Sequence, residues 1–430
     1  MQTVRLALIG FGNVGQGFAQ ILLERGDSYA ETFGLRFVIV AVNDLVLGCA
    51  FNPNGLDLKT ILQAKDLSAL PDGAAGWNAL EAIARCNADV VIELSFTNLQ
   101  TGEPAISHVH AALENGKHVV TSNKGPVALR YAELSDLARS KKLQIGVEGT
   151  VMSGTPSLHL GMELLAGAGI RRVQGILNGT TNYILTQMEG GASYADALAD
   201  AQARGYAEAD PTGDVEGFDA AGKVAILSAL LMNSPLRLDQ VDRTGITGIT
   251  KADVETAKAA GQRWKLIGSL EKSPAGLTAS VKPVRLPLEH PLANVNGATN
   301  AITYTTDLLG EVTLIGPGAG RLETGYAIIC DLLSIYRSRL KDFFSMALAP
   351  RAARKSSSQN LPGIGRSLPG RKREGFGWAA CLCLDEACVP AMAEFFTCTG
   401  WRKMEFFLRS PAIENKITGK SSAANHLLLP

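Results

Sequence analysis

The sequence lacks the signals of membrane insertion and secretion. No apolar run approaches the roughly 20 residues that a helix needs to cross a bilayer. The N-terminus passes from Met1 straight into the strand-like VRLALI, with no small-residue cleavage site of a secretory signal. We therefore expect a cytoplasmic protein without a membrane partner.

Cysteine is scarce, with seven residues among 430 and no disulfide-like spacing. The first 336 residues hold three of them: Cys49, Cys86 and Cys330. This usage favours a reducing compartment. Three others cluster near the C-terminus without the second matched pair that a zinc site needs, so no zinc is expected: Cys381, Cys383 and Cys388.

Net charge is absent, because 41 Lys and Arg residues balance 41 Asp and Glu residues. The balance is uneven: residues 337–430 hold 15 basic against 7 acidic residues, which leaves 26 against 34 for residues 1–336. An acidic main part argues against nucleic-acid binding. The tail at 338–430 is basic and rich in Ser, Pro and Gly, so we expect poor order there. Its abrupt change of composition would also fit an altered reading frame.

Apolar, β-branched runs alternate with helix-like segments through the first 150 residues. The runs are residues 4–9, 35–44, 88–95, 117–123 and 143–148. This alternation predicts an α/β fold with a Rossmann-type, doubly wound parallel sheet over residues 1–148. The rhythm then changes, which indicates an α+β substrate domain at 149–315. A final helix-like stretch predicts that residues 316–337 return to the first domain.

A glycine-rich turn follows the first run and precedes a helix that we expect to end at Gly26. Gly10, Gly12 and Gly15 have the G-x-G-x-x-G spacing, which in this context predicts dinucleotide binding. The predicted cofactor-binding residues of the turn are Gly10, Phe11, Gly12, Asn13, Val14 and Gly15. Asp44 ends the second run, where an acidic residue favours NAD over NADP by repelling a 2′-phosphate. Alternatively, Asp44 only caps a turn.

The stretch YAEADPTGDVEGFDAAGKVAIL, residues 206–227, crowds five carboxylates beside one cation, Lys223. Lys223 follows Asp219 by four residues, so a helix would put both on one face. A partly buried lysine can act as a general acid or base, although a neighbouring carboxylate favours its charged form. Lys124 is a second candidate, because it lies just past a parallel strand. The alternatives are a surface ion pair and a solvated loop lysine.

Several ordered motifs make residues 1–337 resemble the homoserine dehydrogenase family. They are GFGNVG (10–15), ELSFTN (93–98), TSNKGPVAL (121–129), GVEGTVMSGTP (146–156), LNGTTNYIL (177–185), GYAEADPTGDVEGFDAAGKVAIL (205–227) and GPGAG (316–320). The resemblance implies interconversion of L-homoserine and L-aspartate 4-semialdehyde with NAD or NADP. This step leads to threonine, methionine and isoleucine. We expect no threonine feedback through the tail, which does not resemble a regulatory domain.

The resemblance also implies roles for individual residues. Lys223 is favoured as acid and base and Lys124 as a polarising cation, without excluding the reverse. Substrate binding is implied for Gly205, Glu208, Asp219, Asp214, Asn178 and Thr180, with Tyr183 beside them. Cofactor contacts are implied for Thr97, Lys124 and Gly318. A loop resembles the family's monovalent-cation site, with a sodium-type ion expected at Glu148, Val151, Ser153 and Thr155. A homodimer through the second domain is expected as well.

Overall fold

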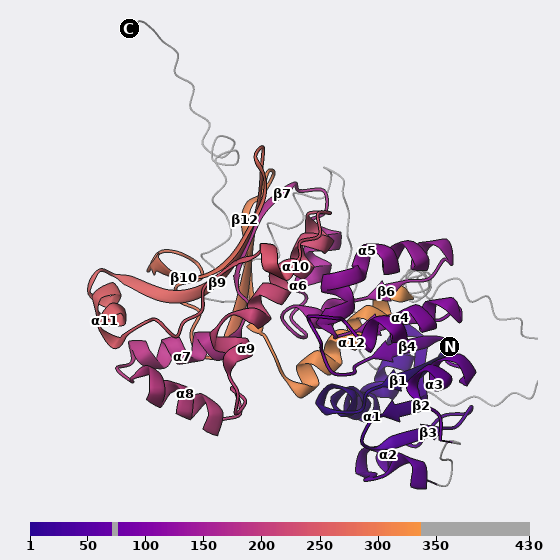
Figure 1. Cartoon of the computed structure of the whole chain (residues 1–430). Coiled ribbons are helices and arrows are strands. Elements are labelled where there is room, and N and C mark those ends of the chain that lie inside the picture. Colours follow the sequence, from indigo (N-terminus) through magenta and orange to yellow (C-terminus); the bar gives the residue numbers. More distant parts are fainter. Residues whose placement is uncertain (71–75, 337–430) are drawn as a thin grey trace, which may run out of the picture. The chain divides into compact units, whose positions relative to one another are not determined.

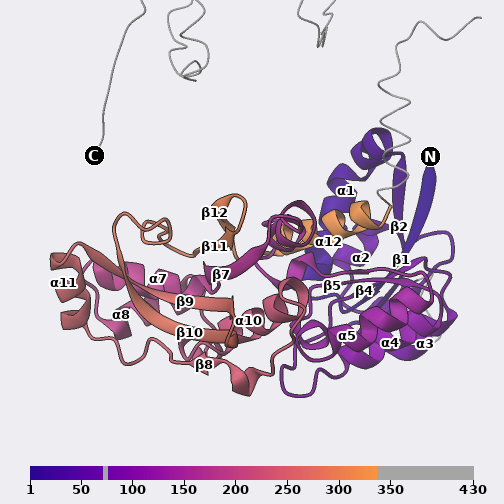
Figure 2. The ribbon, with the colours of Figure 1, turned by 90° about the horizontal axis from the view of Figure 1, so that it is seen from above.

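A six-stranded sheet with helices on both faces forms the N-terminal part of the chain (Figures 1 and 2). The computed structural model describes residues 1–70 and 76–336. The strands lie in the order β3-β2-β1-β4-β5-β6, and all neighbours are parallel except β2 and β3. Their bounds are β1 (Gln2–Ile9), β2 (Leu35–Asp44), β3 (Gly48–Phe51), β4 (Val90–Glu93), β5 (His118–Thr121) and β6 (Ile145–Gly146). The predicted doubly wound α/β fold is confirmed, although the antiparallel edge strand β3 was not predicted.

The central strand β1 is apolar along its length because both of its faces are covered. Leu6 and Leu8 join one apolar cluster, and Ala7 and Ile9 join another on the opposite face. The covering helices are α1 (Asn13–Phe33), α2 (Leu58–Gln63), α3 (Ala79–Arg85), α4 (Ala105–Glu114) and α5 (Lys124–Ser140), with a 3-10 turn at Leu67–Ala69.

Helix α1 continues past Gly26, so the predicted stop at that glycine is wrong. A glycine inside a helix costs only about 1 kcal/mol, and tertiary packing of Tyr29, Ala30 and Phe33 extends the apolar stripe beyond it. The helix ends instead at Gly34, whose φ of 67° is the left-handed conformation of a C-cap.

The second sheet is mainly antiparallel, in agreement with the predicted α+β part. Its order is β12-β11-β7-β9-β10-β8, and only the β8–β10 pair is parallel. The strands are β7 (Ile170–Ile176), β8 (Asp242–Arg243), β9 (Gln262–Ser273), β10 (Gly276–Pro287), β11 (Thr299–Thr306) and β12 (Gly310–Pro317). The helices are α6 (Ser157–His159), α7 (Gly179–Glu189), α8 (Tyr194–Ala203), α9 (Thr212–Val215), α10 (Phe218–Leu231) and α11 (Lys251–Ala259); short 3-10 turns lie at Glu148–Thr150 and Leu238–Gln240, and a π-helical turn lies at Leu160–Leu164.

The chain returns to the first sheet in helix α12 (Arg321–Ile335), which lies beside α1 (Figure 1). The two helices approach closely at glycines: a Cβ on Gly17 would lie 2.2 Å from the Arg321 carbonyl oxygen, and one on Gly325 would lie 2.8 Å from the Phe18 nitrogen. The last helix therefore packs against the helix that follows the glycine-rich turn. The tail at 338–430, with its three clustered cysteines, lies outside the described residues.

Candidate active site

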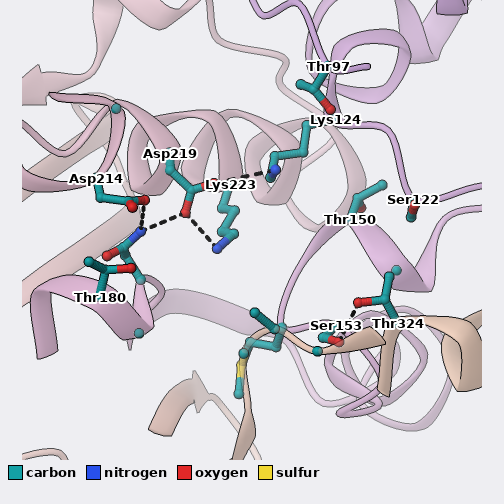
Figure 3. Close-up of a pocket in the computed structure, with 18 of the residues that line it drawn as sticks. Thr97, Ser122, Lys124, Thr150, Ser153, Thr180, Asp214, Asp219, Lys223 and Thr324 are labelled. Atoms are coloured by element: carbon teal, nitrogen blue, oxygen red, sulfur yellow. Dashed lines mark hydrogen bonds and ion pairs between the residues drawn. The ribbon is translucent and has the colours of Figure 1, made fainter. Parts of the chain in front are cut away.

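A cavity of about 1340 Å³ brings segments of both sheets together (Figure 3). From the first sheet it is lined by Val14 and by the loops that follow β4 and β5, at the carboxyl ends of parallel strands. From the second it is lined by the starts of α7 and α10, the loop between α8 and α9, and the glycine-rich segment after β12.

Two of the three glycines of the turn are sterically required, and the third lies next to open space. Gly10 has a φ of +99°, and a Cβ there would lie 2.5 Å from the Leu94 carbonyl oxygen. A Cβ on Gly15 would lie 2.8 Å from the Gly10 carbonyl oxygen, whereas one on Gly12 would meet no atom within 4 Å. The first turn of α1 holds no acidic residue, so no carboxylate of the helix itself offsets the positive end of its dipole. This geometry fits a dinucleotide's pyrophosphate.

The side chains of this turn differ in their access to the cavity. Val14 lines it, and Asn13 is exposed at the start of α1. Phe11 is 1% exposed, so its ring belongs to the core and only its backbone is near the turn.

Asp44 ties the end of β2 to this turn. Its carboxylate accepts hydrogen bonds from the backbone N–H groups of Phe11 (2.7 Å), Val46 (2.9 Å) and Leu47 (3.0 Å). Partial burial works to raise the pKa of Asp44, but these hydrogen bonds lower it below its usual value. The side chain is thus both a turn cap and a fixed negative charge. It is not among the residues that line the cavity.

Asp219 lies between two lysines (Figure 3). One carboxylate oxygen accepts a hydrogen bond from Lys223 Nζ at 2.8 Å, and the other lies 3.4 Å from Lys124 Nζ. Lys223 is 7% exposed and also donates to the Leu177 carbonyl oxygen at 2.5 Å. Burial works to raise the pKa of Asp219, but the ammonium groups of both lysines, with hydrogen bonds, hold it far below its usual range. The predicted meeting of Asp219 and Lys223 on one helix face is observed, and α5 adds Lys124 to the pair.

Asn178 joins a second carboxylate to this group. It caps α7, and its amide donates to Asp214 at 2.7 Å and to Asp219 at 3.0 Å. Burial raises the pKa of Asp214, and the neighbouring charge of Asp219 adds to this effect. One amide therefore holds two carboxylates side by side, while two lysines offset their charge.

The other predicted substrate residues mostly line the cavity as well. Gly205 and Glu208 do so from the loop after α8, and Thr180 does so while donating to the Tyr206 carbonyl oxygen at 2.6 Å. Tyr183 does not: its ring is buried against Tyr206, and its hydroxyl donates to Asp200. The interpretation of Tyr183 as a lining residue is therefore wrong. The spacing of residues along α7 shows which of them share a face, but it does not show which face lines the cavity and which packs inside the protein.

The structure also adds lining residues that sequence reasoning missed. They are chiefly Ser95, Ser122, Arg204, Tyr206 and Phe218. All of these except Arg204 fall inside the motifs quoted above, so the motifs themselves were the available signal. Thr97 and Gly318, both predicted near the cofactor, line the cavity too.

Gly318 is required by the buried residue beneath it. A Cβ on Gly318 would lie 2.0 Å from Asn300 Cγ, and Asn300 is fully buried. Asn300 also lies against Gly179, where a Cβ would be 3.3 Å from Asn300 Oδ1, and its amide atoms have no hydrogen-bond partner in the described structure. Any side chain at position 318 would collide with it, so backbone alone faces the cavity at this point.

The loop expected to hold a cation is tightly bonded within the protein. The buried Glu148 carboxylate accepts hydrogen bonds from Leu158 N (3.0 Å), His159 N (2.7 Å) and His159 Nδ1 (2.5 Å). The side chains of two other expected ligands are also engaged: Ser153 Oγ with Thr324 at 2.7 Å, and Thr155 Oγ1 with the Pro317 carbonyl oxygen at 2.9 Å. Among the described residues, no group of three His, Cys, Asp or Glu side chains is arranged for a metal ion.

A buried acid, Asp331 on α12, lies next to this loop. Its Oδ2 accepts a hydrogen bond from the Glu148 N–H at 3.0 Å, and its Oδ1 lies 3.7 Å from His159 Nε2. Burial, helped by the Glu148 charge and opposed by His159, raises the pKa of Asp331 to about 8. Near neutral pH the folded protein therefore keeps a proton that the unfolded chain releases.

Because of this proton, the free energy of unfolding falls as the pH rises. Between about pH 4 and 8 the native state binds the extra proton, so Asp331 lowers stability as the pH rises. We expect Asp331→Asn, which cannot ionise, to gain stability over the wild type as the pH goes from 5 to 8. The gain should be at least about 1.4 kcal/mol, the equivalent of one pKa unit. Melting temperatures at both pH values measure it.

The control for this prediction is Asp136→Asn, on the exposed face of α5 and paired with Arg139. Its difference from the wild type should stay nearly constant over the same pH range. An Asp331→Asn variant with a similarly constant difference would mean that Asp331 is ionised in the native protein.

A nucleotide-binding turn beside a cavity with paired lysines and carboxylates defines a dinucleotide-dependent oxidoreductase. Comparison with known proteins gives the particular family. A family model described as homoserine dehydrogenase matches residues 156–333, and one described as its NAD binding domain matches residues 10–148. The chain belongs to the homoserine dehydrogenase family.

The similarity to individual relatives extends over most of the length of each relative. An NAD(+)-dependent homoserine dehydrogenase of Pseudomonas canavaninivorans is 45% identical over 343 residues, which are 79% of this chain and 97% of the relative. A crystal structure titled putative homoserine dehydrogenase, from Archaeoglobus fulgidus, is 35% identical with a TM-score of 0.70, covering 77% of this chain and 99% of that one. A hyperthermophilic archaeal homoserine dehydrogenase mutant in complex with NADPH is 30% identical with a TM-score of 0.68, covering 78% and 98%. In the described part of the chain no helix has the length and apolar character needed to cross a membrane.

Proposed function

We propose that the protein interconverts L-homoserine and L-aspartate 4-semialdehyde with a nicotinamide dinucleotide, in threonine, methionine and isoleucine biosynthesis. The observation that carries this proposal is the ion group of Asp219, Lys223 and Lys124 inside the cavity that Val14 of the glycine turn also lines. The cavity thus places charged side chains that can bind the groups of an amino alcohol next to a turn that can bind a dinucleotide, and the oxidation of an amino alcohol requires both.

Lys223 acts as the acid and base in this proposal. A nicotinamide dinucleotide, when bound, would supply the acceptor for the hydride that leaves the alcohol carbon and, in reverse, the hydride donor. When the alcohol is oxidised, Lys223 Nζ takes the hydroxyl proton, and in the reverse reaction it returns that proton to the developing alkoxide. Its contacts with Leu177 and Asp219 fix the direction of the amine and support the assignment. Lys124 then polarises the reacting oxygen, and the exchange of these two roles is the alternative.

Carboxylates select an ammonium-bearing substrate. Glu208 is exposed to the cavity and Asp219 stays ionised, so both can accept charge-assisted hydrogen bonds from the homoserine ammonium. The Gly205 backbone and the groups of Asn178 and Thr180 complete the substrate shell, with Asp214 behind Asn178. The second candidate function is a dehydrogenase for another small amino- or hydroxy-substrate that fits the same charges.

The cofactor is NAD or NADP, and Asp44 favours NAD. A carboxylate with a lowered pKa keeps a negative charge near the ribose site, where it would repel a 2′-phosphate. Relatives with either cofactor are known, since one is an NAD(+)-dependent homoserine dehydrogenase and another is in complex with NADPH.

A monovalent cation at the loop of Glu148, Val151, Ser153 and Thr155 would be held by backbone carbonyl oxygens. The Glu148 carboxylate and the Ser153 and Thr155 hydroxyls already have partners, so they are not free ligands. Left-handed backbone at Met152 and Ser153, with φ of 60° and 56°, makes a tight turn in this loop. The Val151 and Thr155 carbonyl oxygens each accept one hydrogen bond from Ser157, so a cation would use their second lone pairs.

We further propose a cytoplasmic homodimer built from two-domain subunits. The division at residue 148 agrees with the separation of strands β1 to β6 from β7 to β12. Strand β12 is an edge strand of the second sheet with exposed Ile315, and the adjoining Leu308 and Leu309 are exposed as well. An edge of this kind supports pairing with a second copy. The three free cysteines of the described part support a reducing compartment.

The test is an assay of the full-length protein with L-homoserine and either NAD or NADP, following the absorbance of the reduced nicotinamide. We expect turnover, with a higher kcat/KM for NAD. Turnover of another hydroxy-substrate but not homoserine would favour the second candidate function. Higher kcat/KM for NADP would contradict the role given to Asp44.

A further inference from the structure

Two loops of the first sheet reach the cavity next to each other. The strands β4 and β5 pair in parallel with Glu93 opposite Thr121, so the loops that follow them leave the same edge of the sheet. The loop after β4 carries Ser95 and Thr97 to the cavity, and the segment after β5 carries Lys124. The position of one loop relative to the other therefore sets the distance between Lys124 and a ligand that contacts Thr97.

One side chain, Asn123, links the two loops. Its Nδ2 donates to the carbonyl oxygens of Ser95 at 3.0 Å and Phe96 at 3.1 Å. Its Oδ1 accepts from the Gly125 N–H at 3.0 Å, which caps α5. Its backbone N–H donates to Thr121 Oγ1 at 2.9 Å. Asn123 is 2% exposed, so these hydrogen bonds are shielded from water.

The loop after β4 is also held from the other side, by Glu93. This fully buried carboxylate accepts hydrogen bonds from the Ser95 N–H and hydroxyl, and lies 3.2 Å from His108 Nδ1. Thr121 Oγ1 donates to the Glu93 carbonyl oxygen at 2.9 Å. Ser95 is thus fixed at both its N–H and its carbonyl group, and Asn123 supplies the bond that connects it to α5.

We propose that Asn123 is a positioning residue for the reaction: it sets the place of Lys124, the first residue of α5, relative to the Ser95–Thr97 loop. This inference rests on the proposed function, because it takes both loops to face the reacting groups. Asn123 lines the cavity but acts through its neighbours, since its side-chain donors and acceptor are used within the protein. A shift of about 1 Å between reacting groups is enough to slow an enzyme on the order of 100-fold.

The test separates this link from the helix cap. Asn123→Ser keeps a capping oxygen but is too short to reach Ser95 and Phe96, whereas Asn123→Ala loses both functions. Asn78 supplies a matched control, because it caps α3 through Glu81 N at 2.9 Å, is exposed and does not line the cavity. The same two substitutions are made at Asn78.

We expect Asn123→Ser to lower kcat for homoserine about 10- to 100-fold, with a smaller change in KM. Its melting temperature should fall below that of Asn78→Ser, because Asn123 is buried and the Ser95 and Phe96 carbonyl oxygens lose their donors. Both Asn78 variants should keep the wild-type kcat. A kcat for Asn123→Ser within twofold of the wild type would overturn the proposal and leave Asn123 as a cap. If Asn123→Ser gives no folded protein, Asn123→Asp takes its place, because it keeps the shape and the cap but loses the two donors.

A failure of the proposed function would look different. In that case the wild type itself would not turn over homoserine, and the link is then measured by NADH binding through fluorescence. We expect Asn123→Ser to weaken NADH binding roughly 2- to 10-fold, because the lost hydrogen bonds no longer hold the Ser95–Thr97 loop in place at the cavity, and Asn78→Ser to leave it unchanged. Equal binding by both variants would overturn the inference.

Discussion

Replacing Lys223 by methionine should lower kcat by roughly 1,000- to 10,000-fold in both directions, the upper range for loss of a general acid or base. Methionine keeps the volume of the side chain but has no proton to exchange. Lys223 is 7% exposed, and its only hydrogen bonds in the described structure go to Asp219 and the Leu177 carbonyl oxygen. The other amine next to Asp219, Lys124 Nζ, lies 3.4 Å from the opposite carboxylate oxygen. The measurement is kcat against pH for homoserine oxidation, with Lys223→Ala alongside.

Two other lysines decide how the result is interpreted. Lys258→Met is the control, because Lys258 is an exposed lysine of α11 that does not line the cavity. Its amine donates to the Glu189 carbonyl oxygen. It should match the wild type. Lys124→Met should slow turnover but keep the pH-dependent rise in rate, since Lys124 only polarises the oxygen in our proposal. If the rise disappears in Lys124→Met and persists in Lys223→Met, the two lysines have the opposite roles.

The local parts of this site were predictable because their signals are short in sequence. The G-x-G-x-x-G spacing needs only one turn, and the structure gives a steric reason for Gly10 and Gly15 and open space at Gly12. Likewise, four residues separate Asp219 from Lys223, and helical geometry alone puts them together. Strands that end at one sheet edge explain why Thr97 and Lys124 were expected near a ligand.

The missed features depend on residues far apart in the chain. Asp331 meets Glu148 across 183 residues, and Asn123 meets Ser95 across 28. No periodicity or motif specifies such partners, because they are set by how α12 and two loops pack after the sheet forms. The error at Gly26 has a related cause, since tertiary packing of the later part of α1 outweighs the weak helix preference of one glycine.

Asp219→Asn should slow homoserine oxidation about 100-fold and move the rise of kcat with pH to lower pH. The wild-type carboxylate lies 2.8 Å from Lys223 Nζ and 3.4 Å from Lys124 Nζ, and its charge favours the ammonium form of both. An amide removes that attraction and leaves two ammonium groups facing a neutral group. With that charge gone, the base gives up its proton more readily, which is the reason for the expected direction. The rate falls nonetheless, because the amine and the substrate ammonium are held less firmly.

The direction of this shift is the decisive part of the result. Asp219 has a pKa held far below its usual range, so it stays ionised at every pH of the assay and its own titration cannot cause the shift. Asp214→Asn is the matched control, because Asp214 bonds to the same amide of Asn178 but forms no ion pair with a lysine in the described structure. It should shift the rise by less. A rise that stays in place, or moves to higher pH, in Asp219→Asn would mean that neither lysine next to Asp219 is the base.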